Sequence, residues 1–190
     1  MELSPLLKAR TAGVFYLLCI LAGIFGATFA RGGLGLAANL IGTACYVVVT
    51  VILYDLLRPV NRSLSLLAAL FSLAGCGIGV LHLLHLPSPT VSELVFFGFY
   101  CLLLAYLIFN STFFPRFLSV LLTITGLGWL TFLWPNLGEH LFFPYVMVGG
   151  LAGEGSLTLW LLAVGVDARR WNERYRRGSK RGRVVVDRPL

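Results

Sequence analysis

Residues 34 to 54 have the sequence LGLAANLIGTACYVVVTVILY, an uninterrupted run without Asp, Glu, Lys or Arg. A helix that crosses the hydrocarbon core of a bilayer needs about 20 such apolar residues. Helices of soluble proteins instead keep a polar face toward water, which interrupts the apolar residues every few positions. The run therefore predicts a transmembrane helix.

The composition of the whole chain supports a membrane protein. Hydrophobic residues make up 58% of the 190 residues and charged residues only 12%, whereas about 25% of residues are charged in a typical soluble domain. The segments between the apolar runs are too short to hold a domain. The sequence thus excludes a nucleotide-binding module or a soluble catalytic domain.

Six runs have the length of a membrane span, so we predict an all-α, polytopic transmembrane helical bundle with six spans. Five of them lack charged residues, whereas the sixth contains Glu154 near its middle. Pro144 in the sixth run suggests that its helix begins a few residues late. The predicted spans are Thr11–Ala30, Leu34–Tyr54, Ser63–Leu86, Leu94–Asn110, Phe117–Trp134 and Leu141–Val166.

The distribution of basic residues predicts the direction of these spans, because short cytoplasmic loops are enriched in Lys and Arg. With both termini in the cytoplasm, 14 of the 15 basic residues lie on the cytoplasmic side, and only Arg31 lies outside. We therefore expect residues 1–166 to form a membrane domain and residues 167–190 to form a basic cytoplasmic tail.

The tail carries nine of the 15 Lys and Arg residues. Residues 168 to 177, ARRWNERYRR, predict a helix that continues out of the membrane with Trp171 and Tyr175 at the interface. We expect the tail to bind anionic lipid, and RNA or an acidic partner is the less favoured alternative. The residues expected at lipid headgroups are Arg169, Arg170, Arg174, Arg176 and Arg177.

Glu154 is the residue that most strongly suggests a function. A carboxylate at bilayer depth costs several kcal/mol unless it is neutral, paired or in contact with water. Thr158 lies one turn further along the same helical face, and glycines on that face leave room for a cavity. Glu154 is therefore expected to form a proton or cation site or a ligand anchor, or else to bond a neighbouring helix in a purely structural role.

Two histidines near the outer end of the third span form a second candidate site. His82 and His85 lie one turn apart, and Glu93, Glu139 and His140 in the outer segments could approach them. Imidazole and carboxylate ligands suit zinc or a similar ion. The candidate metal ligands are His82, His85 and His140, but their spacing is not diagnostic and we predict no cofactor.

The alternative for these histidines is hydrogen bonding at the membrane interface. Asn39 on the second predicted span is then the expected partner of His82. The candidate polar site within the membrane accordingly consists of Glu154, Thr158, Asn39 and His82.

The four cysteines, Cys19, Cys45, Cys76 and Cys101, all lie in apolar runs, and we expect them to be small core residues without disulfides.

Four stretches that together span most of the chain are characteristic: ARTAGVFYLL at residues 9–18, YDLLRPVNRSLSLLAA at 54–69, FGFYCLLLAYL at 97–107 and GEGSLTLWLLAVGV at 153–166. They resemble a bacterial membrane family known as domain of unknown function 4386. The resemblance implies a six-span protein of the bacterial cytoplasmic membrane, and it includes Glu154. It implies no activity.

Three functions remain open from the sequence. The first is a non-enzymatic accessory or structural membrane component that self-associates or binds other membrane proteins. The second is a small proton- or cation-coupled transporter that uses a cavity around Glu154. The openings Arg62-Ser-Leu-Ser-Leu-Leu and Arg116-Phe-Leu-Ser-Val-Leu suggest the internal repeat of such proteins, although the positive-inside rule explains them equally well. The third is a haem- or metal-binding protein that uses His82 and His85.

Overall fold

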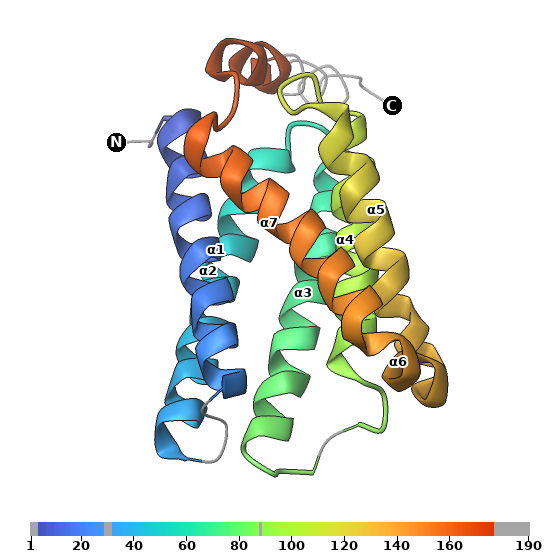
Figure 1. The fold of residues 1–190 in the computed structure, drawn as a ribbon. Coiled ribbons are helices and arrows are strands. Elements are labelled where there is room, and N and C mark those ends of the chain that lie inside the picture. Colours follow the sequence, from blue (N-terminus) through green and yellow to red (C-terminus); the bar gives the residue numbers. More distant parts are fainter. Residues whose placement is uncertain (1–3, 29–31, 88, 177–190) are drawn as a thin grey trace, which may run out of the picture.

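The computed structural model describes residues 4–28, 32–87 and 89–176, and this part of the chain is helical, with turns between the helices and no strand. The all-α class is therefore confirmed. In Figure 1 most of the long helices run alongside one another, and α7 crosses the others diagonally. The long helices are α1 (Pro5–Thr28), α2 (Gly33–Leu57), α3 (Arg62–Leu83), α4 (Glu93–Phe109), α5 (Arg116–Leu130) and α7 (Met147–Ala163).

Among the described residues, four helices are long and apolar enough to cross a bilayer. They are α1, α2, α3 and α5, the last of which is extended by the short 3-10 helix η1 (Thr131–Leu133). Helix α7 reaches the length of a span only when it is counted with the bent helix Ala168–Arg176. Helix α4 is apolar but has 17 residues. The described part of the chain thus has four to five candidate spans by length and composition, and the six-span topology stays a prediction.

Local signals explain where several helices begin. The side chain of Asn61 caps α3 by accepting a hydrogen bond from the backbone N–H of Leu64 (3.1 Å). Ser92 caps α4 in the same way, through the N–H of Leu94 (3.3 Å). Helix α1 begins at Pro5, before the predicted apolar run, because the helix continues through the polar residues that precede the run.

The region before α7 is more broken than the predicted sixth span. Pro135–Leu141 form a short helix, α6, and Phe142–Val146 form a kinked turn, η2, in which Phe143 has non-helical angles (φ −119°, ψ 130°). Helix α7 begins at Met147. The late start predicted for the sixth helix is therefore confirmed, whereas α6 was not predicted.

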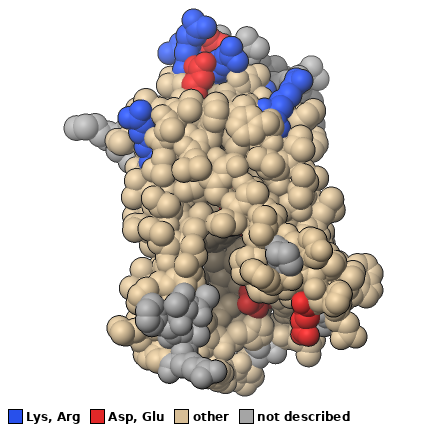
Figure 2. Space-filling view, viewed as in Figure 1, with Lys and Arg blue, Asp and Glu red and all other residues tan. Residues whose placement is uncertain are grey.

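The six long helices form a closed ring. Each packs mainly against two neighbours, in the order α1, α2, α3, α4, α5 and α7, and α7 closes the ring by contacting both α5 and α1. One end of the ring, which we call the basic end, carries Lys8, Arg10, Arg58, Arg62 and Arg116, and Figure 2 shows Lys and Arg gathered at this end of the visible face. Fully buried side chains fill the ring there, including Leu53, Leu57, Leu104, Leu118 and Leu161.

The helix Ala168–Arg176 does not continue α7 but is bent by 98° from it. The turn contains Gly165, whose φ of 73° lies in the left-handed region that glycine adopts without strain. Trp171 is buried, and its Nε1 donates a hydrogen bond to the carbonyl oxygen of Leu56 (2.9 Å). The predicted helix in this stretch is therefore confirmed, but it does not continue the sixth predicted span, because Trp171 fixes it across the basic end.

Candidate functional site

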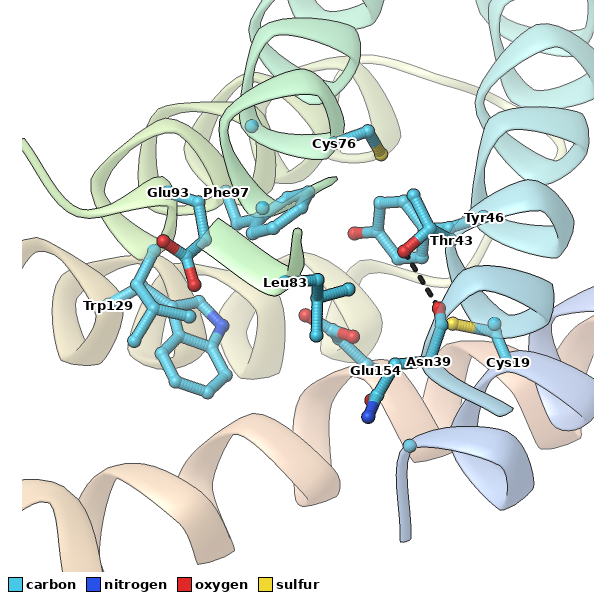
Figure 3. A pocket seen from close by; sticks show the side chains of 15 residues that line it. Cys19, Asn39, Thr43, Tyr46, Cys76, Leu83, Glu93, Phe97, Trp129 and Glu154 are labelled. Atoms are coloured by element: carbon cyan, nitrogen blue, oxygen red, sulfur yellow. Dashed lines mark hydrogen bonds between the residues drawn. The ribbon is translucent and has the colours of Figure 1, made fainter. Parts of the chain in front are cut away.

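A cavity of about 320 Å³ lies inside the ring, in the half away from the basic end. All six long helices contribute to its walls. Figure 2 shows a hollow in the lower half of the visible face, and Figure 3 shows the cavity from close by. The lining residues are Cys19, Gly23, Asn39, Gly42, Thr43, Tyr46, Gly75, Cys76, Gly79, Leu83, Glu93, Leu94, Phe97, Trp129 and Glu154.

Glycines help to form this space. A Cβ atom at Gly75 would lie 3.2 Å from the ring of Phe97 and 3.3 Å from the carbonyl oxygen of Glu93, so glycine lets α3 and α4 approach closely. A Cβ atom at Gly23, by contrast, would meet no atom within 4 Å. Gly75 therefore lets two helices pack closely, whereas the missing side chain at Gly23 leaves space in the cavity.

The side chain of Glu154 reaches the cavity from the middle of α7. It stands on the face of α7 that carries Gly150, Thr158 and Leu161, all of which are buried. This confirms the predicted inward face. The Glu154 side chain itself is only partly buried, because it borders the cavity.

Polar groups surround the Glu154 carboxyl but do not satisfy all of its hydrogen-bond acceptor sites. The thiol of Cys101 donates to Oε1 over 3.8 Å, the length of a weak hydrogen bond to sulfur. Tyr16 and Trp129 also lie near the carboxyl. The hydroxyl of Tyr16 and Nε1 of Trp129 are nevertheless buried without a completed hydrogen bond among the described residues.

Three tyrosines cluster beside Glu154. The ring centroid of Tyr46 lies 5.5 Å from that of Tyr16 and 6.0 Å from that of Tyr100. All three hydroxyls are buried and lack a hydrogen-bond partner in the described part of the chain. A buried polar group without a partner costs about 1–3 kcal/mol. Of the three tyrosines only Tyr46 lines the cavity, where water or a ligand can complete the hydrogen bonds of its hydroxyl.

Glu93 is the second carboxyl of the cavity and stands where α4 begins. Its Oε2 lies 2.7 Å from Nδ1 of His82. The predicted pairing of His82 with Asn39 is wrong, because the Asn39 amide nitrogen donates to the carbonyl oxygen of Gly35 (2.9 Å). Asn39 instead lines the cavity, where its backbone carbonyl accepts a hydrogen bond from the Thr43 hydroxyl (2.9 Å).

The candidate metal ligands are not brought together. Within the described residues, no group of three or more His, Cys, Asp or Glu side chains is placed to hold a metal ion. His85 is exposed just after α3, and His140 is exposed on α6. The structure thus gives His82 a single carboxylate partner, Glu93, and no third ligand among these residues.

Only some of the four residues predicted to form a polar site lie together in the structure. Glu154 and Asn39 both line the cavity. Thr158 is buried one turn along α7, where its hydroxyl donates to the carbonyl oxygen of Glu154 (2.7 Å). His82 lies outside the lining and reaches the cavity only through Glu93.

Sequence reasoning missed the aromatic groups around Glu154. Tyr16, Tyr46, Tyr100 and Trp129 lie in apolar runs, where an aromatic side chain can face either lipid or protein. A signal was present for Tyr16, because it follows Ala12 by four positions and precedes Cys19 by three. That spacing places it on a face of small residues, which is a helix-packing face.

Of the arginines expected at lipid headgroups, Arg169 and Arg176 are exposed and Arg174 is partly buried. Arg170 donates from Nη1 to the carbonyl oxygen of Thr112 (3.1 Å). Arg177 lies outside the described residues. Lipid contact by these side chains stays a prediction.

The cysteines behave as predicted, since all four are free, with Cys45, Cys76 and Cys101 buried and Cys19 partly buried.

The chain matches the family described as a domain of unknown function, DUF4386, over residues 31–92 and 90–165. These segments cover well over half of its length. The chain belongs to the DUF4386 family. The matched part of this DUF4386 protein includes Glu154, Glu93 and Tyr46, but not the portion of α1 that lines the cavity.

An uncharacterised protein from Archaeoglobus fulgidus is 34% identical to the DUF4386 chain over 90 residues. The match covers 44% of this chain and 56% of that protein, so the chain spans little more than half of its relative. No solved structure matches the chain. The comparisons therefore give the family and leave the activity to be argued from the cavity.

Proposed function

We propose that this DUF4386 protein is a multi-pass protein of the bacterial cytoplasmic membrane, with six spans and both termini in the cytoplasm. The gathering of Lys and Arg at the basic end supports this orientation. Helices α4 and α7, at 17 residues each, reach the lower limit of about 17 residues for a span. In this arrangement residues 1–166 form the membrane domain, and residues 167–190 form a basic tail at anionic lipid.

Reporter fusions test the topology. Alkaline phosphatase, which is active only outside the cytoplasm, should be inactive when fused to the C-terminus. The same reporter should be active when fused after Leu86, in the segment between α3 and α4. The reverse pattern would contradict the proposed orientation, and activity at both sites would contradict the three spans proposed between Leu86 and the C-terminus.

Within this topology, the protein acts as a small proton- or cation-coupled transporter whose solute enters the cavity around Glu154. The observation that carries this proposal is a cavity built by all six long helices, with Glu154 and Glu93 as its charged residues. Its volume of about 320 Å³ falls within the range of about 300–1,000 Å³ typical of ligand pockets. The leucine-rich core closes the basic end, which leaves the cavity in the other half.

A non-enzymatic accessory role is the second candidate. It is favoured by Gly77 on α3 and Gly155 on α7, where an added Cβ atom would meet nothing within 4 Å. Glycines with open space on a transmembrane helix allow another helix to approach closely. A second copy of the chain or another membrane protein would be the partner. Neither candidate includes a catalytic step.

Flux measurements in liposomes separate the two candidates. Purified protein should mediate proton flux under an imposed membrane potential, and Glu154→Gln should lower that flux by roughly tenfold or more, because it removes the intramembrane carboxylate. Glu139→Gln is the matched control, since Glu139 is exposed on α6 and does not line the cavity, and should leave flux unchanged. Folded protein without flux above that of empty liposomes would contradict transport and leave the accessory role.

A further inference from the structure

We propose that the cavity around Glu154 binds a small organic cation, with its ammonium group at the Glu154 carboxyl and its alkyl or aryl part against the aromatic wall. This inference rests on the proposed function, because it names the class of solute that the cavity takes. Four properties of the cavity support it: its charge, its volume, its aromatic walls and the unpaired hydroxyl of Tyr46.

The charge of the lining favours a cation. No Lys, Arg or His is among the lining residues, and Glu93 and Glu154 are the acidic ones. Glu93 already has the imidazole of His82 as a partner. Among the described residues, the Glu154 carboxyl accepts a hydrogen bond from the thiol of Cys101, which is a weak donor without positive charge. A carboxylate at bilayer depth is stabilised by a partner of opposite charge, and a bound cation would supply that charge at Glu154.

The volume favours a polyatomic ion over a metal ion. One water molecule occupies about 30 Å³ of liquid, so a cavity of about 320 Å³ has room for several atoms beyond a single hydrated charge. A metal ion would also need several oxygen, nitrogen or sulfur ligands around one point. The described residues provide no such group of three or more His, Cys, Asp or Glu.

The walls favour an ion with an apolar part. Phe97, Tyr46 and Trp129 line the cavity together with Leu83 and Leu94. Aromatic faces attract ammonium groups and are themselves apolar, so they stabilise both parts of an organic cation. In Figure 3 these aromatic side chains surround the space that the Glu154 carboxyl enters.

The unpaired hydroxyl of Tyr46 supplies a further, independent indication of a ligand. Tyr46 lines the cavity and is 7% exposed, and its hydroxyl has no hydrogen-bond partner in the described part of the chain. The Tyr46 hydroxyl points into the cavity in Figure 3. A hydroxyl oxygen can accept a hydrogen bond from an ammonium N–H or from a hydroxyl group of the ligand.

Calorimetry on the purified full-length protein tests the inference with choline and its uncharged isostere 3,3-dimethylbutan-1-ol as probes. Choline should bind saturably, and the isostere should bind more weakly by roughly tenfold or more, because it has the same shape without the charge. Glu154→Gln should weaken choline binding to a similar extent, whereas Glu139→Gln should not change it. Sodium chloride at matched ionic strength is the inorganic control and should not compete.

Several results would overturn the inference. They are equal binding of choline and its isostere, unchanged choline affinity in folded Glu154→Gln, or no binding of choline at millimolar concentration. The first comparison uses the unsubstituted protein, so it holds even if a variant does not fold. Glu154-dependent proton flux without choline binding would contradict only the proposal that the solute is an organic cation. Choline binding without any flux would contradict only the proposal that the protein is a transporter.

Discussion

At the scale of single residues, Glu154 is the centre of the site. Its helix turns it toward the other five helices, and the groups it meets are a thiol, phenol rings and an indole instead of a lysine or arginine. The inward direction was predictable from the period of α7, because Thr158 and Leu161 share its face and are buried. The tyrosines were not predictable, because a hydroxyl without a partner is visible only in three dimensions.

The Tyr46 hydroxyl provides a test at this scale. Tyr46→Phe should leave the thermal unfolding midpoint unchanged or raise it slightly, because the lost hydroxyl makes no hydrogen bond. The same change should weaken choline binding, because the hydroxyl faces the cavity. Thermal unfolding in detergent, followed by circular dichroism, and calorimetry provide the two readouts.

Thr50→Val is the matched control for Tyr46→Phe. The Thr50 hydroxyl is buried, lies 2.6 Å from the Ser72 hydroxyl and donates to the carbonyl oxygen of Tyr46 (2.9 Å). Its removal should lower the free energy of unfolding by about 1 kcal/mol. If Tyr46→Phe destabilised the protein as much as Thr50→Val, the Tyr46 hydroxyl would have a structural partner and would not be free to bind a ligand.

At the scale of elements, the contact of α5 with α7 holds Glu154 in place. The Thr125 hydroxyl on α5 donates to the carbonyl oxygen of Gly149 on α7 (2.9 Å). A Cβ atom at Gly153, next to Glu154, would lie 2.0 Å from Oγ1 of Thr125 and 3.0 Å from the carbonyl oxygen of Leu121. Because one of these neighbours is backbone, the two helices would have to move apart.

Two alanine substitutions in α7 test this contact. Gly153→Ala should lower the free energy of unfolding by roughly 1–3 kcal/mol, the usual cost of overpacking. Gly155→Ala, two positions along the same helix, meets no atom within 4 Å and should be neutral or stabilise by up to about 1 kcal/mol through helix propensity. Equal melting temperatures for the two variants in detergent would show that α5 and α7 do not pack as described.

The elements also show where sequence reasoning works. The predicted runs at Leu34–Tyr54 and Leu94–Asn110 match α2 and α4 closely, because length and hydrophobicity define them. Helix α6 was not predicted, because its seven residues are too few to give a periodic hydrophobic pattern. The bend after α7 was not predicted either, because it depends on contacts between distant parts of the chain. The bend depends on a turn at Gly165 and on a bond from Trp171 to Leu56, a residue more than a hundred positions earlier.

At the scale of the whole molecule, the ring of helices is asymmetric from end to end. Its basic end is filled by leucines, crossed by the helix Ala168–Arg176 and surrounded by basic side chains. Its other half contains the cavity with two carboxyls. Composition predicted the charge asymmetry, whereas the cavity depends on how six helices meet. We propose that this acidic cavity opens on the side of the membrane away from the basic end.

Chemical labelling from outside the cell tests the direction in which the cavity opens. Thr43→Cys places a reporter in the cavity wall, in a chain whose other lining cysteines, Cys19 and Cys76, are replaced by alanine. In intact spheroplasts, a membrane-impermeant cationic methanethiosulfonate should label this cysteine, and its anionic counterpart should react more slowly by roughly tenfold or more, because the cavity is acidic. Glu154→Gln should reduce that ratio. Equal rates for the two reagents, or labelling only after the membrane is permeabilised, would contradict an acidic cavity that opens to the outside.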